Sequence, residues 1–121
     1  MLARIRLPRG VSQALVNLLD NAAKYSGESK SIAVRTYAEN GCAVLEVEDH
    51  GIGIPREEQD KIFRRFYRVG NAVAKGGYGL GLYLVRHIMD AHQGRVELES
   101  ELRRGSRFRL LFPAVEPGPH L

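Results

Sequence analysis

The stretch Gln13–Tyr25, QALVNLLDNAAKY, carries side chains whose types and spacing could bind a ligand. On a helix of 3.6 residues per turn, Gln13, Asn17, Asn21 and Lys24 fall on one edge, and apolar side chains fall on the other. An exposed helix face normally carries Glu, Lys and Arg, and asparagine is a poor helix former. The amide edge is therefore either a binding site or an ordinary polar surface.

Length and composition limit the classes of protein that this chain can be. At 121 residues it is long enough for one domain with its own apolar core, and its 44% hydrophobic and 26% charged residues are those of a globular protein. The single Cys42 favours a reducing compartment, and no apolar run reaches membrane-spanning length, so we expect a cytoplasmic domain without membrane contact. The net charge of +4 favours an anionic partner: nucleotide, nucleic acid or anionic lipid.

Hydrophobic periodicity and turn residues predict the elements that position these side chains. We expect strands at 2–7, 32–38, 43–48, 96–100 and 108–112, helices at 11–25, 56–64 and 79–92, and a long loop at 65–78. This order predicts an α/β (α+β) fold, a two-layer sandwich with three helices on one face of a mixed, mostly antiparallel sheet. The other face of the sheet is open or meets a partner. The domain is expected to span residues 1–113, followed by a flexible tail at 114–121.

Several familiar site patterns are missing. There is no GxxxxGK[ST], and the glycines of GYGLGL fail GxGxxG because Leu82 stands at the last glycine position. His87 and His92 are five apart and do not share a helix face, which argues against zinc. There is no GxSxG around a nucleophilic serine. The segment FRRFYR could bind nucleic acid, but Phe63 and Phe66 at helical spacing are better explained as core anchors.

Four segments, NLLDNAAKY, DHGIGIP, IFRRFYR and GYGLGLYLV, follow one another in this order. Together they resemble the Asn box, first glycine box, phenylalanine box and second glycine box of the ATP-binding catalytic domain of sensor histidine kinases. The closing GSRFRLLFP is similar to the strand that completes that domain. The resemblance covers nearly the whole chain, and it implies the two-layer fold that is shared with gyrase-type and Hsp90-type ATPases.

The resemblance implies ATP and Mg²⁺ as cofactors. It makes Asn17 the ligand of a Mg²⁺ ion that bridges the phosphates, a role that suits an amide oxygen because Mg²⁺ prefers oxygen ligands. Asp49 is expected to accept a hydrogen bond from the adenine amino group, and Arg68 to stabilise charge on the transferred phosphoryl group. Residues 69–78 correspond to a lid over the nucleotide.

The expected catalytic residues are Asn17, Lys24 and Arg68. The residues expected to contact the nucleotide or its metal ion are Asn17, Asn21, Lys24, Tyr25, Asp49, Gly51, Gly53, Ile54, Arg68, Lys75, Gly77, Tyr78, Gly79, Leu80, Gly81, Leu82 and Ser106. Two positions depart from what the resemblance implies. Tyr78 is larger than the residue expected there, and Gln13 stands where hydrolytic relatives carry a glutamate base.

The resemblance implies a kinase that donates the γ-phosphoryl group of Mg-ATP to a histidine. None of the four histidines has the sequence context of a phosphoacceptor, so this histidine is expected on a separate dimerisation domain. A response regulator would act downstream, and no nucleic acid would take part. Two alternatives stay open: a serine kinase of the same fold that acts on a regulatory protein, and a non-catalytic nucleotide-binding module.

Overall fold

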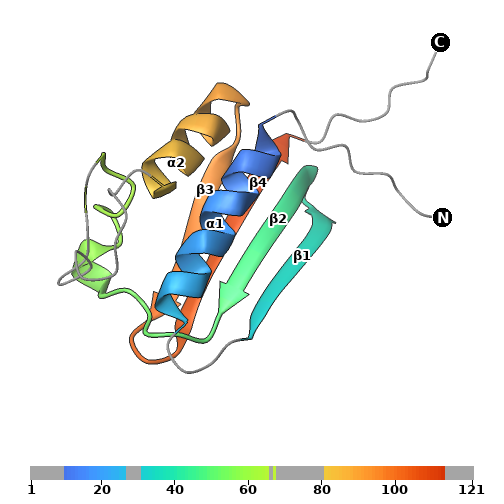
Figure 1. Cartoon of the computed structure of the whole chain (residues 1–121). Coiled ribbons are helices and arrows are strands. Elements are labelled where there is room, and N and C mark those ends of the chain that lie inside the picture. The colour runs from blue at the N-terminus through green and yellow to red at the C-terminus, as the bar shows by residue number, and fades with distance from the viewer. Residues whose placement is uncertain (1–9, 27–30, 66, 68–80, 114–121) are drawn as a thin grey trace, which may run out of the picture.

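The fold of the described residues is two-layered, with two α-helices on one face of a four-stranded sheet in a computed structural model (Figure 1). The structure describes residues 10–26, 31–65, 67 and 81–113. In chain order the elements are α1 (Val11–Tyr25), β1 (Ile32–Glu39), β2 (Cys42–Asp49), a 3₁₀ turn η1 (Arg56–Glu58), α2 (Gly81–Ala91), β3 (Arg95–Glu101) and β4 (Gly105–Pro113). The strand order in the sheet is β1-β2-β4-β3.

The two-layer α+β class is confirmed, with one correction to the number of helices. Every pairing among the described strands is antiparallel, in keeping with the mostly antiparallel sheet that was expected. The described residues form two α-helices, whereas three were expected. The strand expected at 2–7 and the tail expected at 114–121 lie outside the described residues. No helix among the described residues is both long and apolar enough to cross a membrane.

The hairpin between β1 and β2 forms where the sequence predicts it. Asn40 has φ 49° and Gly41 has φ 77°, so both central residues of the turn are left-handed. A two-residue turn of this kind matches the twist of the flanking strands. The hairpin therefore fixes the register of β1 and β2. Glu39 pairs with Cys42 next to the turn, and the pairs farther from the turn, as far as Ile32 with Asp49, follow from it.

The helix expected at 56–64 is wrong, because only η1 is helical and the chain continues in turns. Backbone bonds in this segment run mainly from residue i to i−3, as in Lys61 N to Glu58 O at 2.9 Å and Arg64 N to Lys61 O at 2.9 Å. Tertiary contacts explain the difference. Ile62 is buried in the core, and the Phe63 ring meets Phe108 edge-on at 6.2 Å. These anchors override helix propensity, which is a weak force over one or two turns.

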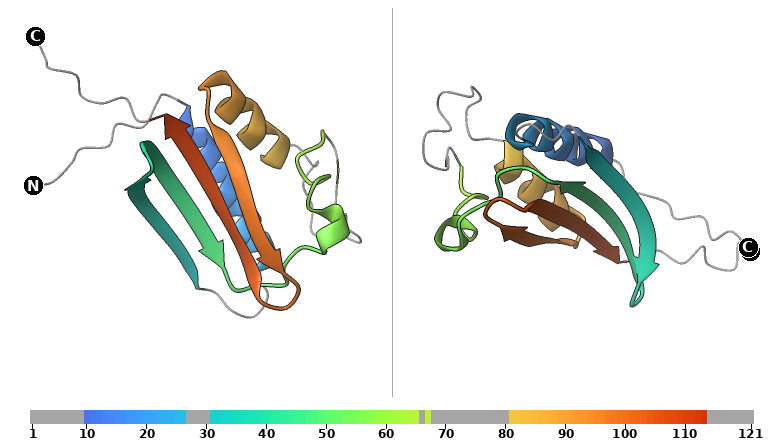
Figure 2. Two further views of the ribbon diagram at one scale, coloured as in Figure 1. Left: turned by 180° about the vertical axis from the view of Figure 1, so that it is seen from behind. Right: turned by 90° about the horizontal axis from the view of Figure 1, so that it is seen from below.

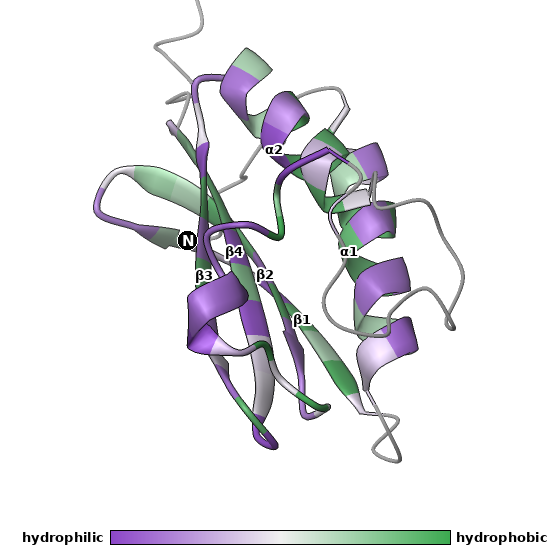
Figure 3. Ribbon diagram, turned by 90° about the vertical axis from the view of Figure 1, so that its left-hand side faces the viewer, coloured by the Kyte–Doolittle hydropathy of each residue, from purple (hydrophilic) through white to green (hydrophobic). Residues whose placement is uncertain are grey.

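The core is formed by buried residues of the helices and of the sheet, which lie as two layers with both helices on one side of the sheet (Figure 2). α1 turns its hydrophobic side toward the strands and its hydrophilic side away from them (Figure 3). In the sheet, three neighbouring strands meet in matched apolar rows. Leu45 pairs with Leu110, which pairs with Val96, and the next row joins Val47, Phe108 and Leu98. These rows belong to the core cluster that the helices cover.

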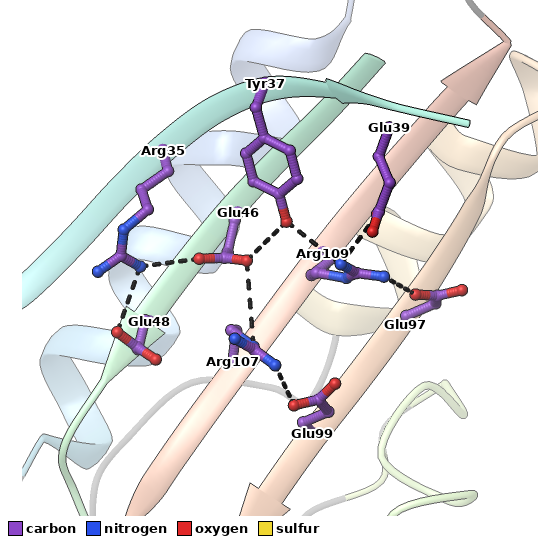
Figure 4. Close-up of polar contacts among 9 residues, drawn as sticks. All are labelled: Arg35, Tyr37, Glu39, Glu46, Glu48, Glu97, Glu99, Arg107 and Arg109. Atoms are coloured by element: carbon purple, nitrogen blue, oxygen red, sulfur yellow. Dashed lines mark hydrogen bonds and ion pairs between the residues drawn. The ribbon is translucent and has the colours of Figure 1, made fainter. Parts of the chain in front are cut away.

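The opposite face of the sheet is lined by charged residues that pair across the strands (Figure 4). Glu46 of β2 lies at the centre, where it accepts hydrogen bonds from Arg35 at 2.8 Å and from the Tyr37 hydroxyl at 2.8 Å. Arg109 bridges Glu39 on one side and Glu97 on the other. This face was expected to be open or to meet a partner. No described helix covers it, and its alternating charges satisfy one another.

Two carboxylates of this face have a lowered pKa. Burial opposes the ionisation of Glu46, but hydrogen bonds from Tyr37 and Arg35 outweigh burial, so the pKa of Glu46 is below its ordinary value. Hydrogen bonds from Arg109 and Arg95 likewise lower the pKa of Glu97. A carboxylate whose pKa is lower in the folded state stabilises the fold above its unfolded pKa and loses that contribution as the pH falls.

We therefore expect the free energy of unfolding to decrease as the pH is lowered below about 4.5, the ordinary glutamate pKa. Urea titrations between pH 3 and pH 7 measure this dependence. Glu97→Gln should make the dependence shallower, because one lowered pKa is removed. Glu57→Gln, at an exposed position outside the charged face, is the matched control and should leave the dependence unchanged. Equal pH profiles for the wild type and Glu97→Gln would contradict the expectation.

Candidate functional site

At one end of the sheet, the row next to the apolar rows consists entirely of polar residues. Asp49 of β2 pairs with Ser106 of β4, and Ser106 pairs with Ser100 of β3. Strand alternation places all three on the face that carries the helices, because each lies two residues from an inward-facing apolar residue. Asp49 and Ser106 are buried, at 4% and 7% exposed. The core thus ends in a buried polar row, which is a costly arrangement unless its groups are hydrogen-bonded.

The Asp49 carboxylate is held by backbone donors. Gly51 N donates to its Oδ1 at 2.9 Å, and the Ser106 N–H also bonds to it. Burial raises the pKa of Asp49 above its ordinary value, and these two N–H groups oppose the rise without cancelling it. A buried carboxylate that needs further hydrogen bonds is suited to a ligand that donates one.

The glycine turn Asp49–Ile54 joins this carboxylate to α1 and to the β3–β4 hairpin. Ile52 N donates to Tyr25 O at 3.1 Å, and Ile52 O accepts from Arg103 N at 2.8 Å. A Cβ on Gly51 would stand 1.8 Å from Tyr25 O, so only glycine fits against the end of α1. The turn therefore holds Asp49 at a fixed place relative to the amide edge of α1.

The amide edge of α1 joins the two helices. Gln13 Nε2 donates to Asn17 Oδ1 at 2.9 Å, and Asn17 Nδ2 donates to Gly81 O, at the first residue of α2, at 3.3 Å. Asn17 is half-buried. Its amide therefore links the edge of α1 to the first residue of α2.

The remaining described residues of the expected site lie on the same elements. Asn21, Lys24 and Tyr25 are half-buried on α1, and Lys24 forms an ion pair with Asp20 at 3.0 Å. Leu82 is partly buried and packs against the hydrophobic core. Six expected site residues lie outside the described residues: Arg68, Lys75, Gly77, Tyr78, Gly79 and Leu80.

Two residues at the site were not expected from the sequence. Ser100 Oγ accepts a hydrogen bond from Ile54 N at 2.8 Å, and Gln59 Nε2 donates to Ile54 O at 2.9 Å. The pattern Val96, Leu98, Ser100 carried a signal for Ser100, since it places a serine on the apolar side of its strand. Gln59 gave no such signal, because its position depends on the turns that replace the expected helix.

Comparison with known proteins identifies the family. The family described as "Histidine kinase-, DNA gyrase B-, and HSP90-like ATPase" matches residues 7–116. The chain belongs to this family. Membership of this ATPase family implies that the chain binds ATP, and it agrees with the sequence resemblance and with the fold.

Relatives within the family include sensor kinases. The chain is 40% identical over 107 residues to the signal transduction histidine-protein kinase ArlS of Staphylococcus aureus, which covers 87% of this chain and 24% of ArlS. A mycobacterial sensor histidine kinase, MprB, superposes with a TM-score of 0.75 at 33% identity, over 87% of this chain and 70% of that one. The catalytic domain of histidine kinase ThkA superposes with a TM-score of 0.72 at 30% identity, over 86% of this chain and 67% of that one. The chain therefore spans about a quarter of the length of ArlS.

Gly51→Ala should separate the glycine turn from α1. The added Cβ would meet Tyr25 O at 1.8 Å, and this backbone atom cannot move without displacing the end of α1. We expect a loss of at least about 2 kcal/mol in the free energy of unfolding and a loss of ATP affinity, measured by urea titration and calorimetry. Gly41→Ala is the comparison, since its Cβ meets nothing within 4 Å and only its positive φ is strained, at about 1 to 2 kcal/mol. A smaller loss for Gly51→Ala than for Gly41→Ala would contradict the packing argument.

Proposed function

We propose that this chain is the ATP-binding catalytic domain of a sensor histidine kinase, which transfers the γ-phosphoryl group of ATP to a histidine on a separate domain. The observation that carries the proposal is the buried Asp49 carboxylate at the end of the polar row, fixed by a glycine turn against the amide edge of α1. The similarity to ArlS, MprB and ThkA supports the kinase assignment within the ATPase family.

Asp49 gives the site its preference for adenine. Two backbone N–H groups bond to its carboxylate, whose further lone pairs can accept from the adenine amino group. A carboxylate cannot donate to the carbonyl oxygen that guanine and hypoxanthine carry at the same position. Recognition of this kind discriminates strongly, because the wrong base leaves a buried charge without its partner. AMPPNP, an analogue of ATP, is bound in the full-length ShkA structure, which superposes on this chain with a TM-score of 0.75 at 28% identity.

Asn17 suits a magnesium ion held together with the nucleotide phosphates. Its Oδ1 already accepts from Gln13, and an amide oxygen has a second lone pair for a cation. Among the described residues, no three His, Cys, Asp or Glu side chains cluster so as to hold a metal ion. Mg²⁺ at this edge would therefore depend on the amide oxygen, phosphate oxygens and water, which is its usual mode of binding beside phosphates. The bound ion would neutralise charge on the phosphates.

The residues of the edge favour transfer to a protein side chain over hydrolysis. Gln13 lies one turn before Asn17, and its neutral amide cannot take a proton from water. A histidine imidazole is itself a nucleophile and needs no such base. Phosphoryl transfer depends mainly on positioning and charge stabilisation, which we assign to Asn17, Lys24 and Arg68. The histidine would belong to a dimerisation domain outside this chain, and a response regulator would receive the phosphoryl group from it.

Asp49→Asn should change which base the site prefers. The amide keeps an oxygen for the N–H group of Gly51, and its nitrogen then replaces the other carboxylate oxygen and donates where that oxygen accepts. We expect ATP affinity to fall about 10- to 100-fold, with a smaller loss for inosine triphosphate, measured by calorimetry with Mg²⁺. Acidification toward the raised pKa of Asp49 should also reduce the preference of the wild type for ATP. The exposed Asp60→Asn is the control, and an unchanged preference in Asp49→Asn would remove base recognition by Asp49.

Phosphorylation assays test the reaction itself. Incubated alone with labelled ATP, the chain should acquire no acid-labile phosphate, because none of its histidines has a phosphoacceptor context. Addition of a dimeric phosphoacceptor domain from the same full-length protein should yield acid-labile, alkali-stable phosphohistidine on that domain. Asn17→Ala should abolish this transfer if the amide oxygen holds Mg²⁺. Acid-stable phosphoserine on a partner, or rapid ATP hydrolysis without transfer, would overturn the histidine kinase proposal.

A further inference from the structure

We propose that Ser100 and Gln59 are positioning residues for base recognition: together they fix the glycine turn on β3, and Ser100 also sets the direction of the Ser106 hydroxyl. This inference rests on the proposed function, in which Asp49 recognises adenine. Both residues act through the turn, and Ser100 also acts through Ser106.

Ile54, the last residue of the turn, is held at both of its backbone polar groups. Its N–H donates to Ser100 Oγ at 2.8 Å, and its carbonyl oxygen accepts from Gln59 Nε2 at 2.9 Å. Gln59 Nε2 also donates to Ser100 O at 3.1 Å, so its two hydrogens bridge the turn and β3. All these groups are partly buried, where hydrogen bonds are not readily replaced by water. The three residues form one clamp between the turn and the sheet.

The clamp fixes the end of the turn, and other contacts fix its start. Asp49 is fixed by pairing with Ser106 in the sheet, and Ile52 is fixed between Tyr25 and Arg103. Gly53 has φ 72°, and a Cβ on it would stand 2.1 Å from Glu101 O, so the backbone passes directly over β3. Without the clamp, the Ile54 end would be free to lift from β3. The part of the turn that lies beside Asp49 would then lose its fixed position over β3.

The hydroxyl groups of the polar row can be assigned donor and acceptor roles. Ser100 Oγ has three neighbours: Ile54 N at 2.8 Å, Gly105 O at 3.0 Å and Ser106 Oγ at 2.8 Å. A hydroxyl has one hydrogen and accepts two hydrogen bonds. All three contacts are satisfied when Ser100 donates to Gly105 O and accepts from Ile54 N and from Ser106. The Ser106 hydrogen then points toward Ser100, and Ser106 offers only its lone pairs to other groups.

This assignment makes the site an acceptor at two neighbouring positions. Asp49 is an acceptor because it is a carboxylate, and Ser106 is an acceptor because Ser100 holds its hydrogen. Two adjacent acceptors match a base that donates through an amino group, directly or through a water molecule. They do not match a base with a carbonyl oxygen at that place. Ser100 thereby contributes to specificity through Ser106.

The test compares the affinity for ATP with the affinity for inosine triphosphate in the 121-residue chain, with the melting temperature as a measure of folding. In Ser100→Ala the hydroxyl of Ser106 is released and Ile54 N loses its acceptor, so the ratio of the two affinities should fall about tenfold. Ser100→Thr keeps the hydroxyl and should restore the ratio to within about twofold of the wild type. Thr36→Ala, which removes a hydroxyl from an exposed strand position, is the control.

Gln59→Glu is the second variant, because it keeps the shape of the side chain and removes both donors. It should also lower the ratio about tenfold, whereas the affinity for inorganic tripolyphosphate should stay within about twofold of the wild type. If Ser100→Ala folds and its ratio of affinities is unchanged, the inference is overturned and the proposed function is not. If Ser100→Ala does not fold, an unchanged ratio in Gln59→Glu has the same meaning. Equal affinity of the wild type for ATP and inosine triphosphate would overturn base recognition by Asp49, and the inference with it.

Discussion

The register of β4 between β2 and β3 is the constraint on which the site depends. It joins Asp49, Ser106 and Ser100 into one row across three strands, immediately beyond rows that are entirely apolar. A shift of one residue would turn every one of these side chains to the opposite face. Because the apolar rows must meet the helices, the hydrophobic core fixes the register, and the polar row then has only one place to lie. The core thus positions the site, although no core residue needs to touch a ligand.

The carboxylates on the two faces of the sheet have different effects on the protein. On the open face, carboxylates meet guanidinium groups, and the pKa values of Glu46 and Glu97 fall, so ionisation there stabilises the fold. On the helix face, burial raises the pKa of Asp49 and the N–H groups of Gly51 and Ser106 only partly oppose the rise, so ionisation there is costly until a ligand supplies a further donor. Ionised carboxylates therefore stabilise the fold on the open face, whereas the carboxylate on the helix face is suited to bind a ligand.

Several parts of the site join elements that are distant in the chain. Asn17 links α1 to the first turn of α2, Ile52 links the glycine turn to both α1 and the β3–β4 hairpin, and Gln59 reaches back to β3. Because of these connections, the position of Asp49 depends on both helices, the glycine turn and the sheet. A change that loosens any of them alters the site before it unfolds the domain, since each is a small part of the total stability.

The sequence by itself determined the helix Val11–Tyr25, the Asn40–Gly41 hairpin and the four described strands, because their periodicity and turn residues are local signals. It also indicated Asp49, the glycines after it and the amide edge, through segments whose order resembles one family. Only the tertiary structure decided that residues 56–64 form turns, because contacts of Ile62 and Phe63 with the core outweigh local propensity. It alone placed Ser100 beside Ser106, because alternation indicates the face on which a strand residue lies but strand pairing decides its neighbour. It alone placed Gln59 beside Ile54, because that position depends on turns that the sequence did not predict.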